Sequence, residues 1–124
     1  MEDYRSTLRL LALRDDRYIE SLLADERESA AISLLDPRAH ALVRVGALIA
    51  IDAAPPSYMS AVDAASREGV TKDEIVGALV AVLPVVGVAR VVSAAPNLGL
   101  ALGYDVAEAL ETREPDGSSR SDDA

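Results

Sequence analysis

The 124-residue chain contains no cysteine, no tryptophan and no phenylalanine, and its only histidine is His40. Without cysteine there can be no disulfide, no thiolate metal ligand, no iron–sulfur cluster and no cysteine nucleophile. A single imidazole also excludes a histidine-based metal cage within one chain. Basic residues are in deficit, because 12 Lys and Arg stand against 21 Asp and Glu, a formal net charge of −9. This acidity disfavours the phosphates of nucleic acid as a partner.

Long uncharged segments are scarce as well. The longest covers residues 75–89, contains Pro84 and Gly87, and is shorter than the roughly 20 apolar residues that span a bilayer. The charged residues 1–5 are not followed by the apolar stretch of a secretory signal. We therefore predict a cytoplasmic protein that does not enter a membrane.

Apolar aliphatic side chains are abundant, since half of the residues are hydrophobic although only 3% are aromatic. We predict an N-terminal helical segment over residues 1–33, a helical domain over residues 34–111, and a disordered acidic tail over residues 112–124. A folded chain of this length buries only about two thirds of its surface. The apolar surplus therefore predicts a homo-oligomer interface.

The apolar residues recur at helical spacing, and no window keeps the alternation of a strand for more than a few residues. Asp36-Pro37 has the pattern of an N-cap followed by a first-turn proline, and Pro55-Pro56 is typical of the start of the next helix. Gly69 suits a left-handed helix end, and Thr71 with Glu74 forms a capping box. We predict an all-α bundle of six or seven helices.

The second half of the domain carries further expectations. Residues 75–83 are apolar on all sides, which predicts a buried helix. Pro84 and Gly87 are predicted to break or kink the chain before a last long helix. Asp52, at the end of an earlier helix, is interpreted as a turn or cap residue.

Three segments in a fixed order support a more specific hypothesis. Residues 35–46 open a helix with proline, residues 58–75 contain a helix ending in glycine and then the capping box, and residues 81–90 contain a Pro-x-x-Gly break. Together they resemble the carboxymuconolactone decarboxylase family, which includes the alkylhydroperoxidase D-like proteins. The resemblance covers roughly residues 34–103. It implies an alkylhydroperoxidase D-like fold around a helical hairpin, assembled as a trimer or hexamer.

The chain departs from this family at the reactive positions. The resemblance places the two thiols of the peroxidases at Ala54 and Ser57, and the histidine at Ala61. A supporting glutamate falls near Ala41 or Leu42. Because peroxide reduction by a dithiol needs a thiolate and a resolving thiol, we expect no thiol peroxidase activity.

The remaining polar residues permit another chemistry. Decarboxylation of a lactone acid needs an acid–base group and a cation that holds the carboxylate. His40 and Arg44 are four residues apart on a predicted helix and share a face, so they are candidates for these roles. Arg90 is the only charged residue from position 76 to 104. We expect it to be mostly buried, either in an ion pair with Asp63 or as the clamp of a small carboxylate ligand.

Two functions stay open, and neither implies a metal or a cofactor. The first is a non-peroxidase binding or assembly module, a helical oligomer that lacks the family's thiol and histidine catalytic residues. The alternative is a divergent small-molecule decarboxylase, hydrolase or isomerase that uses His40, Arg44, Arg90 and a carboxylate such as Asp63. The enzyme requires His40 and Arg90 in one concave site. The module requires Arg90 to be saturated by Asp63 or by backbone carbonyls.

Overall fold

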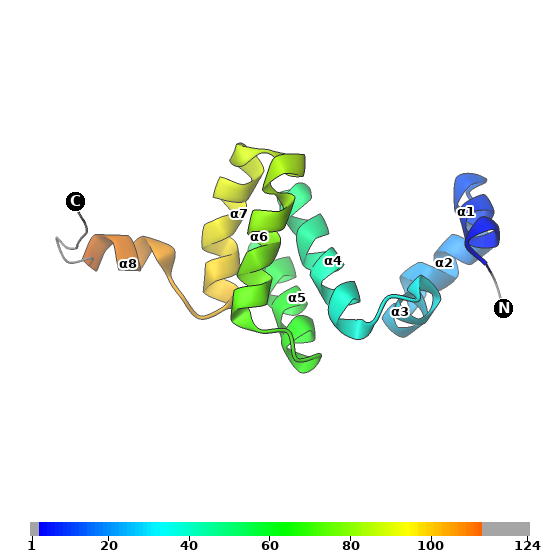
Figure 1. Ribbon diagram of the computed structural model, residues 1–124, viewed down its shortest axis with the longest axis horizontal. Helices are drawn as coiled ribbons and strands as arrows, with labels where there is room; N and C mark the ends of the chain where they lie inside the picture. Colours follow the sequence, from blue (N-terminus) through cyan, green and yellow to red (C-terminus); the bar gives the residue numbers. More distant parts are fainter. Residues whose placement is uncertain (1–2, 113–124) are drawn as a thin grey trace. The chain divides into compact units, whose positions relative to one another are not determined.

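A computed structural model describes residues 3–112, and within this range the chain forms eight α-helices and no strand (Figure 1). The all-α prediction is confirmed, although the helices outnumber the predicted six or seven. The predicted tail lies outside the described residues apart from Thr112, the last residue of α8. The helices are α1 (Tyr4–Ala12), α2 (Asp16–Ala24), α3 (Glu26–Ser33), α4 (Pro37–Ala50), α5 (Pro55–Arg67), α6 (Lys72–Val86), α7 (Val88–Ala101) and α8 (Val106–Thr112).

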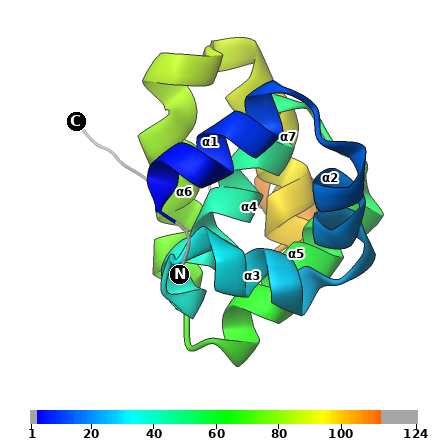
Figure 2. The same cartoon turned by 90° about the vertical axis from the view of Figure 1, so that its right-hand side faces the viewer.

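The chain divides into two compact units after His40, within α4. The first unit contains α1, α2 and α3, which Figure 2 shows in blue to cyan. Asp3, Asp15 and Asp25 begin these helices, each accepting a hydrogen bond of 2.9–3.1 Å from a backbone N–H two or three residues on. None of the residues of α1, α2 and α3 is buried. The predicted division of the chain at residue 33 stays a prediction.

The start and stop signals of the longer helices act as the sequence predicts. Asp36 caps α4 by accepting the N–H of Ala39 at 2.9 Å. At α6, the Thr71 hydroxyl accepts the N–H of Glu74 at 3.1 Å, and the Glu74 carboxylate accepts the N–H of Thr71 at 2.9 Å. Gly69, just after α5, has φ +82°. Side-chain caps therefore determine where α4 and α6 begin, and the positive φ of a glycine determines where α5 ends.

The region around Pro84 differs in part from the expectation. Helix α6 continues through Pro84 to Val86 and ends at Gly87, whose φ of +93° and ψ of +163° lie in a region that is essentially restricted to glycine. Gly87 is therefore the residue that separates α6 from α7, as predicted. Pro84 lies inside the helix and does not end it.

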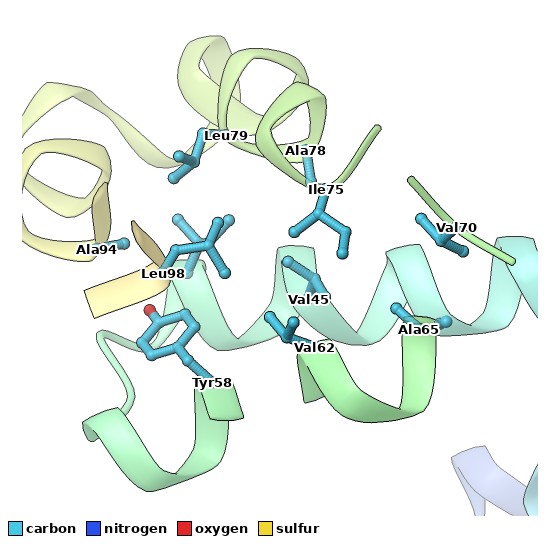
Figure 3. Packing of buried hydrophobic residues seen from close by; sticks show 12 residues of the cluster. Val45, Tyr58, Val62, Ala65, Val70, Ile75, Ala78, Leu79, Ala94 and Leu98 are labelled. Carbon is cyan, nitrogen blue, oxygen red and sulfur yellow. The ribbon is translucent and has the colours of Figure 1, made fainter. Parts of the chain in front are cut away.

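The hydrophobic core belongs to the second unit. It is built from α4, α5, α6 and α7, together with Val70 in the connection between α5 and α6. Figure 3 shows Val45, Val62, Ile75 and Leu98 converging between the helices. Tyr58 is the largest fully buried side chain, and its hydroxyl donates to the Leu48 carbonyl at 3.1 Å. The same carbonyl, near the end of α4, also accepts the N–H of Ala53 at 3.1 Å, and the bond from Tyr58 joins α5 to α4.

Helix α6 is only partly buried, so the prediction that residues 75–83 are buried on all sides is wrong. Ile75, Ala78 and Leu79 lie in the core, whereas Val76 is 44% exposed and Val80 69% exposed. The other helices of the second unit cover one side of α6 and leave the opposite side open. No helix within residues 3–112 is long and apolar enough to cross a membrane.

Candidate functional site

The four residues predicted to form a site lie on three helices. His40 and Arg44 are on α4, Asp63 is on α5 and Arg90 is on α7. His40 is half-buried, and the other three are exposed. His40 belongs to the first unit and the other three to the second. A concave site shared by His40 and Arg90 therefore stays a prediction.

Arg90 has a different environment from the one predicted. Its side chain is 50% exposed, so the expectation of a mostly buried guanidinium is wrong. Its Nη1 lies 3.8 Å from Oδ2 of Asp52, which means that the predicted pairing with Asp63 is wrong as well. The first turn of α7 lies beside the turn that follows α4, and this arrangement brings Asp52 rather than Asp63 to Arg90.

Asp52 is the centre of a small polar cluster, which we call the Asp52 cluster and define as Asp52, Arg90 and Ser93. Its backbone has φ +54°, a left-handed conformation that Asp tolerates better than most residues, so its interpretation as a turn residue is confirmed. The Ser93 hydroxyl donates to Oδ1 of Asp52 at 2.7 Å. Both contacts of this carboxylate come from α7, so the cluster fastens the end of α4 to α7.

The negative charge of Asp52 also affects Tyr58. Burial raises the pKa of the Tyr58 hydroxyl above its ordinary value, and the nearby Asp52 carboxylate raises it further. A backbone hydrogen bond with Ala53 opposes this rise in pKa. The hydroxyl is therefore held in its neutral, hydrogen-bonded form.

The Asp52 cluster has the chemistry of a structural contact. Asp52 is 43% exposed and Arg90 50%, and ion pairs as exposed as this one contribute only about 0–1 kcal/mol. A serine hydroxyl that donates to a carboxylate, with no imidazole or lysine in the contact, is a weak nucleophile. Sequence reasoning missed this cluster because Asp52 and Ser93 carry no motif that links them across 41 positions.

An apolar groove lies between α4 and α6. Its volume is about 490 Å³, and it is lined by Leu42, Val43, Gly46, Glu74, Gly77, Ala78, Ala81 and Val82. A Cβ at Gly46 would lie 3.3 Å from a methyl group of Val82, so α4 and α6 are in tight contact at this glycine. None of the four predicted site residues lines this groove.

The described residues 3–112 contain no group of three or more His, Asp or Glu side chains that could hold a metal ion. Comparison with protein-family models, with curated proteins and with solved structures gives no significant match. The resemblance to the carboxymuconolactone decarboxylase family therefore stays a prediction from the three sequence segments.

Proposed function

We propose that this chain is a non-peroxidase assembly or binding module, a helical homo-oligomer of carboxymuconolactone decarboxylase-like type that acts in the cytoplasm. The observation that carries this proposal is the apolar surface of the second unit. This unit has a closed core and still exposes large aliphatic side chains on four of its helices, one of them Leu110 on α8 and the others on α4, α6 and α7. Those on the three core helices are Val43 on α4, Val76, Val80, Leu83 and Val85 on α6, and Val88, Val92 and Leu100 on α7.

Such a surface favours association over a free monomer. Single exposed aliphatic residues are common on proteins, but contiguous apolar patches mark interaction sites. Complete burial of one valine or leucine contributes about 1.5–3 kcal/mol. Partial burial of several of these side chains would therefore offset much of the entropy that association costs.

The absence of cysteine supports the other half of the proposal. The chain has neither a thiolate nor a resolving thiol, so it has no means of reducing a peroxide by dithiol chemistry. Ser57 stands where the resemblance places a thiol, and a hydroxyl does not replace it. The proposed activity is therefore binding or assembly.

The alternative, a decarboxylase, hydrolase or isomerase, receives less support. Its residues His40, Arg44, Asp63 and Arg90 are absent from the groove between α4 and α6, and Arg90 faces the Asp52 carboxylate. Replacing Arg90 by Met distinguishes the two. A wild type that binds a small carboxylate and an Arg90→Met variant that does not would favour the enzyme, whereas no such binding by either protein would favour the module.

Light scattering coupled to size exclusion tests the proposal. At micromolar concentration we expect a single species of three or six chains, each of 13.0 kDa. In a parallel assay the purified protein should not consume a hydroperoxide in the presence of a dithiol. A 13.0 kDa monomer would contradict the assembly, and steady peroxide turnover would contradict the non-peroxidase assignment.

A further inference from the structure

Helix α6 has an apolar side that points away from the core. We call it the α6 outer face. Its six residues recur at positions that share one side of a helix, and all six are exposed. They are Val76, Gly77, Val80, Ala81, Leu83 and Pro84. A surface helix normally turns charged or polar residues to this side, so a wholly apolar outer face needs a cover.

The α6 outer face is also uncharged in a strongly acidic chain. The chain carries a net charge of −9, yet no charged residue occurs between Glu74 and Arg90. Two copies that meet through this face therefore do not bring carboxylates together. A membrane surface fits less well. Helices that lie on membranes carry basic residues on their polar side, and the only basic residue of α6 is Lys72, next to Asp73 and Glu74.

The shape of the α6 outer face is suited to packing against a second helix. Gly77 and Ala81, which also line the groove beside α4, are four residues apart, and a Cβ added at Gly77 would meet no atom within 4 Å. The backbone is therefore open to close approach at this point. Val76, Val80 and Leu83 stand beside the two small residues and form a ridge. Such a surface can pack against a copy of itself, because the ridge of each helix fits beside the small residues of the other.

We propose that the α6 outer face packs against the same face of a second copy of this chain, antiparallel and around a two-fold axis near Val80. The inference rests on the assembly proposed above and names its interface. Around such an axis the two Asp73 carboxylates lie about 20 Å apart along the helices, beyond the screening length of about 8 Å at physiological salt. A parallel pair would place the two carboxylates side by side. The contact implies an even number of chains, which selects the hexamer over the trimer.

Because the chain contains no cysteine, one introduced cysteine can be tested for cross-linking without interference from other thiols. Val80→Cys places one thiol per chain next to its own symmetry mate, within the roughly 7 Å between Cα atoms that a disulfide tolerates. We expect most of this variant to form a covalent dimer under mild oxidation at micromolar concentration. Ser66→Cys, at an exposed position of α5 outside the apolar surface, is the control and should remain uncross-linked.

A charge introduced into the α6 outer face provides a second test of the contact. Val80→Glu should keep the helical circular dichroism of the wild type, because Val80 is exposed within one chain. It should weaken the two-fold contact at least tenfold and halve the molar mass, or reduce it further. An odd-numbered wild-type assembly, or a wild-type oligomer that Val80→Glu leaves intact and Val80→Cys does not cross-link, would overturn this interface and leave the proposed function standing. A monomeric wild type would overturn both.

Discussion

The two units of the chain are both helical, but only one of them has a core. In the first unit, α1, α2 and α3 are eight or nine residues long, each begins at an aspartate, and no residue of residues 3–40 is buried. In the second unit, α4 to α7 have 13 to 15 residues each, and twelve residues of its described part, up to Thr112, are buried. Both units contain amphipathic sequences with correct caps.

The difference separates helix formation from core formation. A cap stabilises a helix by satisfying backbone N–H groups, and this effect is local. A core requires several helices with enough turns to contact one another along their length. The helices of the first unit have two to three turns, whereas α4 to α7 have about four. Stability is therefore expected to be concentrated in residues 41–112.

The largest expected effect is a loss of stability on truncating a buried side chain of the second unit, compared with truncating an exposed side chain of the first unit. Ile75→Ala removes a fully buried side chain and should lower the free energy of unfolding by about 2–5 kcal/mol. Leu8→Ala, at a residue that is 59% exposed, should change it by about 0.5 kcal/mol or less. Urea unfolding followed by circular dichroism measures both. Equal losses would show that the first unit is as firmly packed as the second.

The next largest effect comes from removing a helix N-cap, which is expected to cost more stability in the second unit than in the first. Thr71→Ala removes half of the capping box of α6 and should lower the free energy of unfolding by about 1 kcal/mol. Asp15→Ala removes the cap of α2 and should reduce helix content with a smaller change in the main unfolding midpoint. Ser66→Ala, at an exposed position of α5, is the control. If the Asp15 variant shifts the midpoint as much as the Thr71 variant, the two units unfold as one.

A smaller effect concerns the buried hydroxyl of the second unit. Tyr58→Phe loses the bond to the Leu48 carbonyl and should lower the free energy of unfolding by about 0.5–1.5 kcal/mol. The raised pKa also gives a pH dependence. The wild-type contribution is complete below the ordinary tyrosine pKa of about 10 and is lost as the pH rises through the higher folded-state pKa.

Unfolding midpoints at pH 8 and pH 11 measure this loss. The Tyr58→Phe variant should lack that part of the alkaline loss, whereas Tyr104→Phe, at a tyrosine that is 59% exposed, should behave as the wild type does. If the Tyr58→Phe variant retains the full alkaline loss of stability, ionisation of Tyr58 is not its cause.

The smallest effect comes from the Asp52 cluster. Asp52→Asn keeps a side chain that tolerates φ +54° and an oxygen that can accept from Ser93, but it loses the charge that faces Arg90. The free energy of unfolding should fall by less than about 1 kcal/mol. Asp63→Asn is the matched control and should have no effect. A larger loss in the Asp63 variant would restore the pairing of Arg90 with Asp63.

The sequence predicts the parts of this fold that depend on near neighbours. The helix starts at Asp36 and Thr71 follow from side chains within three residues of the backbone groups that they satisfy. The end at Gly69 follows from a positive φ that glycine adopts without strain. The all-α class follows from spacing alone. Gly87 ends α6 because its backbone conformation is closed to other residues.

The sequence does not predict what depends on the packing of distant segments. The pairing of Arg90 with Asp52 requires α7 to pass the turn after α4, and no spacing encodes this. Charge and hydrophobicity along the sequence favour Asp63 as the partner of Arg90, although the structure pairs Arg90 with Asp52. The uniform apolar character of residues 75–83 predicts burial but not by what, and in the single chain only one side of α6 is covered.

The concentration dependence of thermal unfolding tests most directly whether another copy covers the α6 outer face. If folding and assembly are linked, the midpoint of the wild type should rise by several degrees between 1 and 100 µM protein, roughly as mass action requires. In the Val80→Glu variant that rise should shrink or disappear. A wild-type midpoint that stays constant over this range would mean that the isolated chain is the folded species, and it would contradict the account.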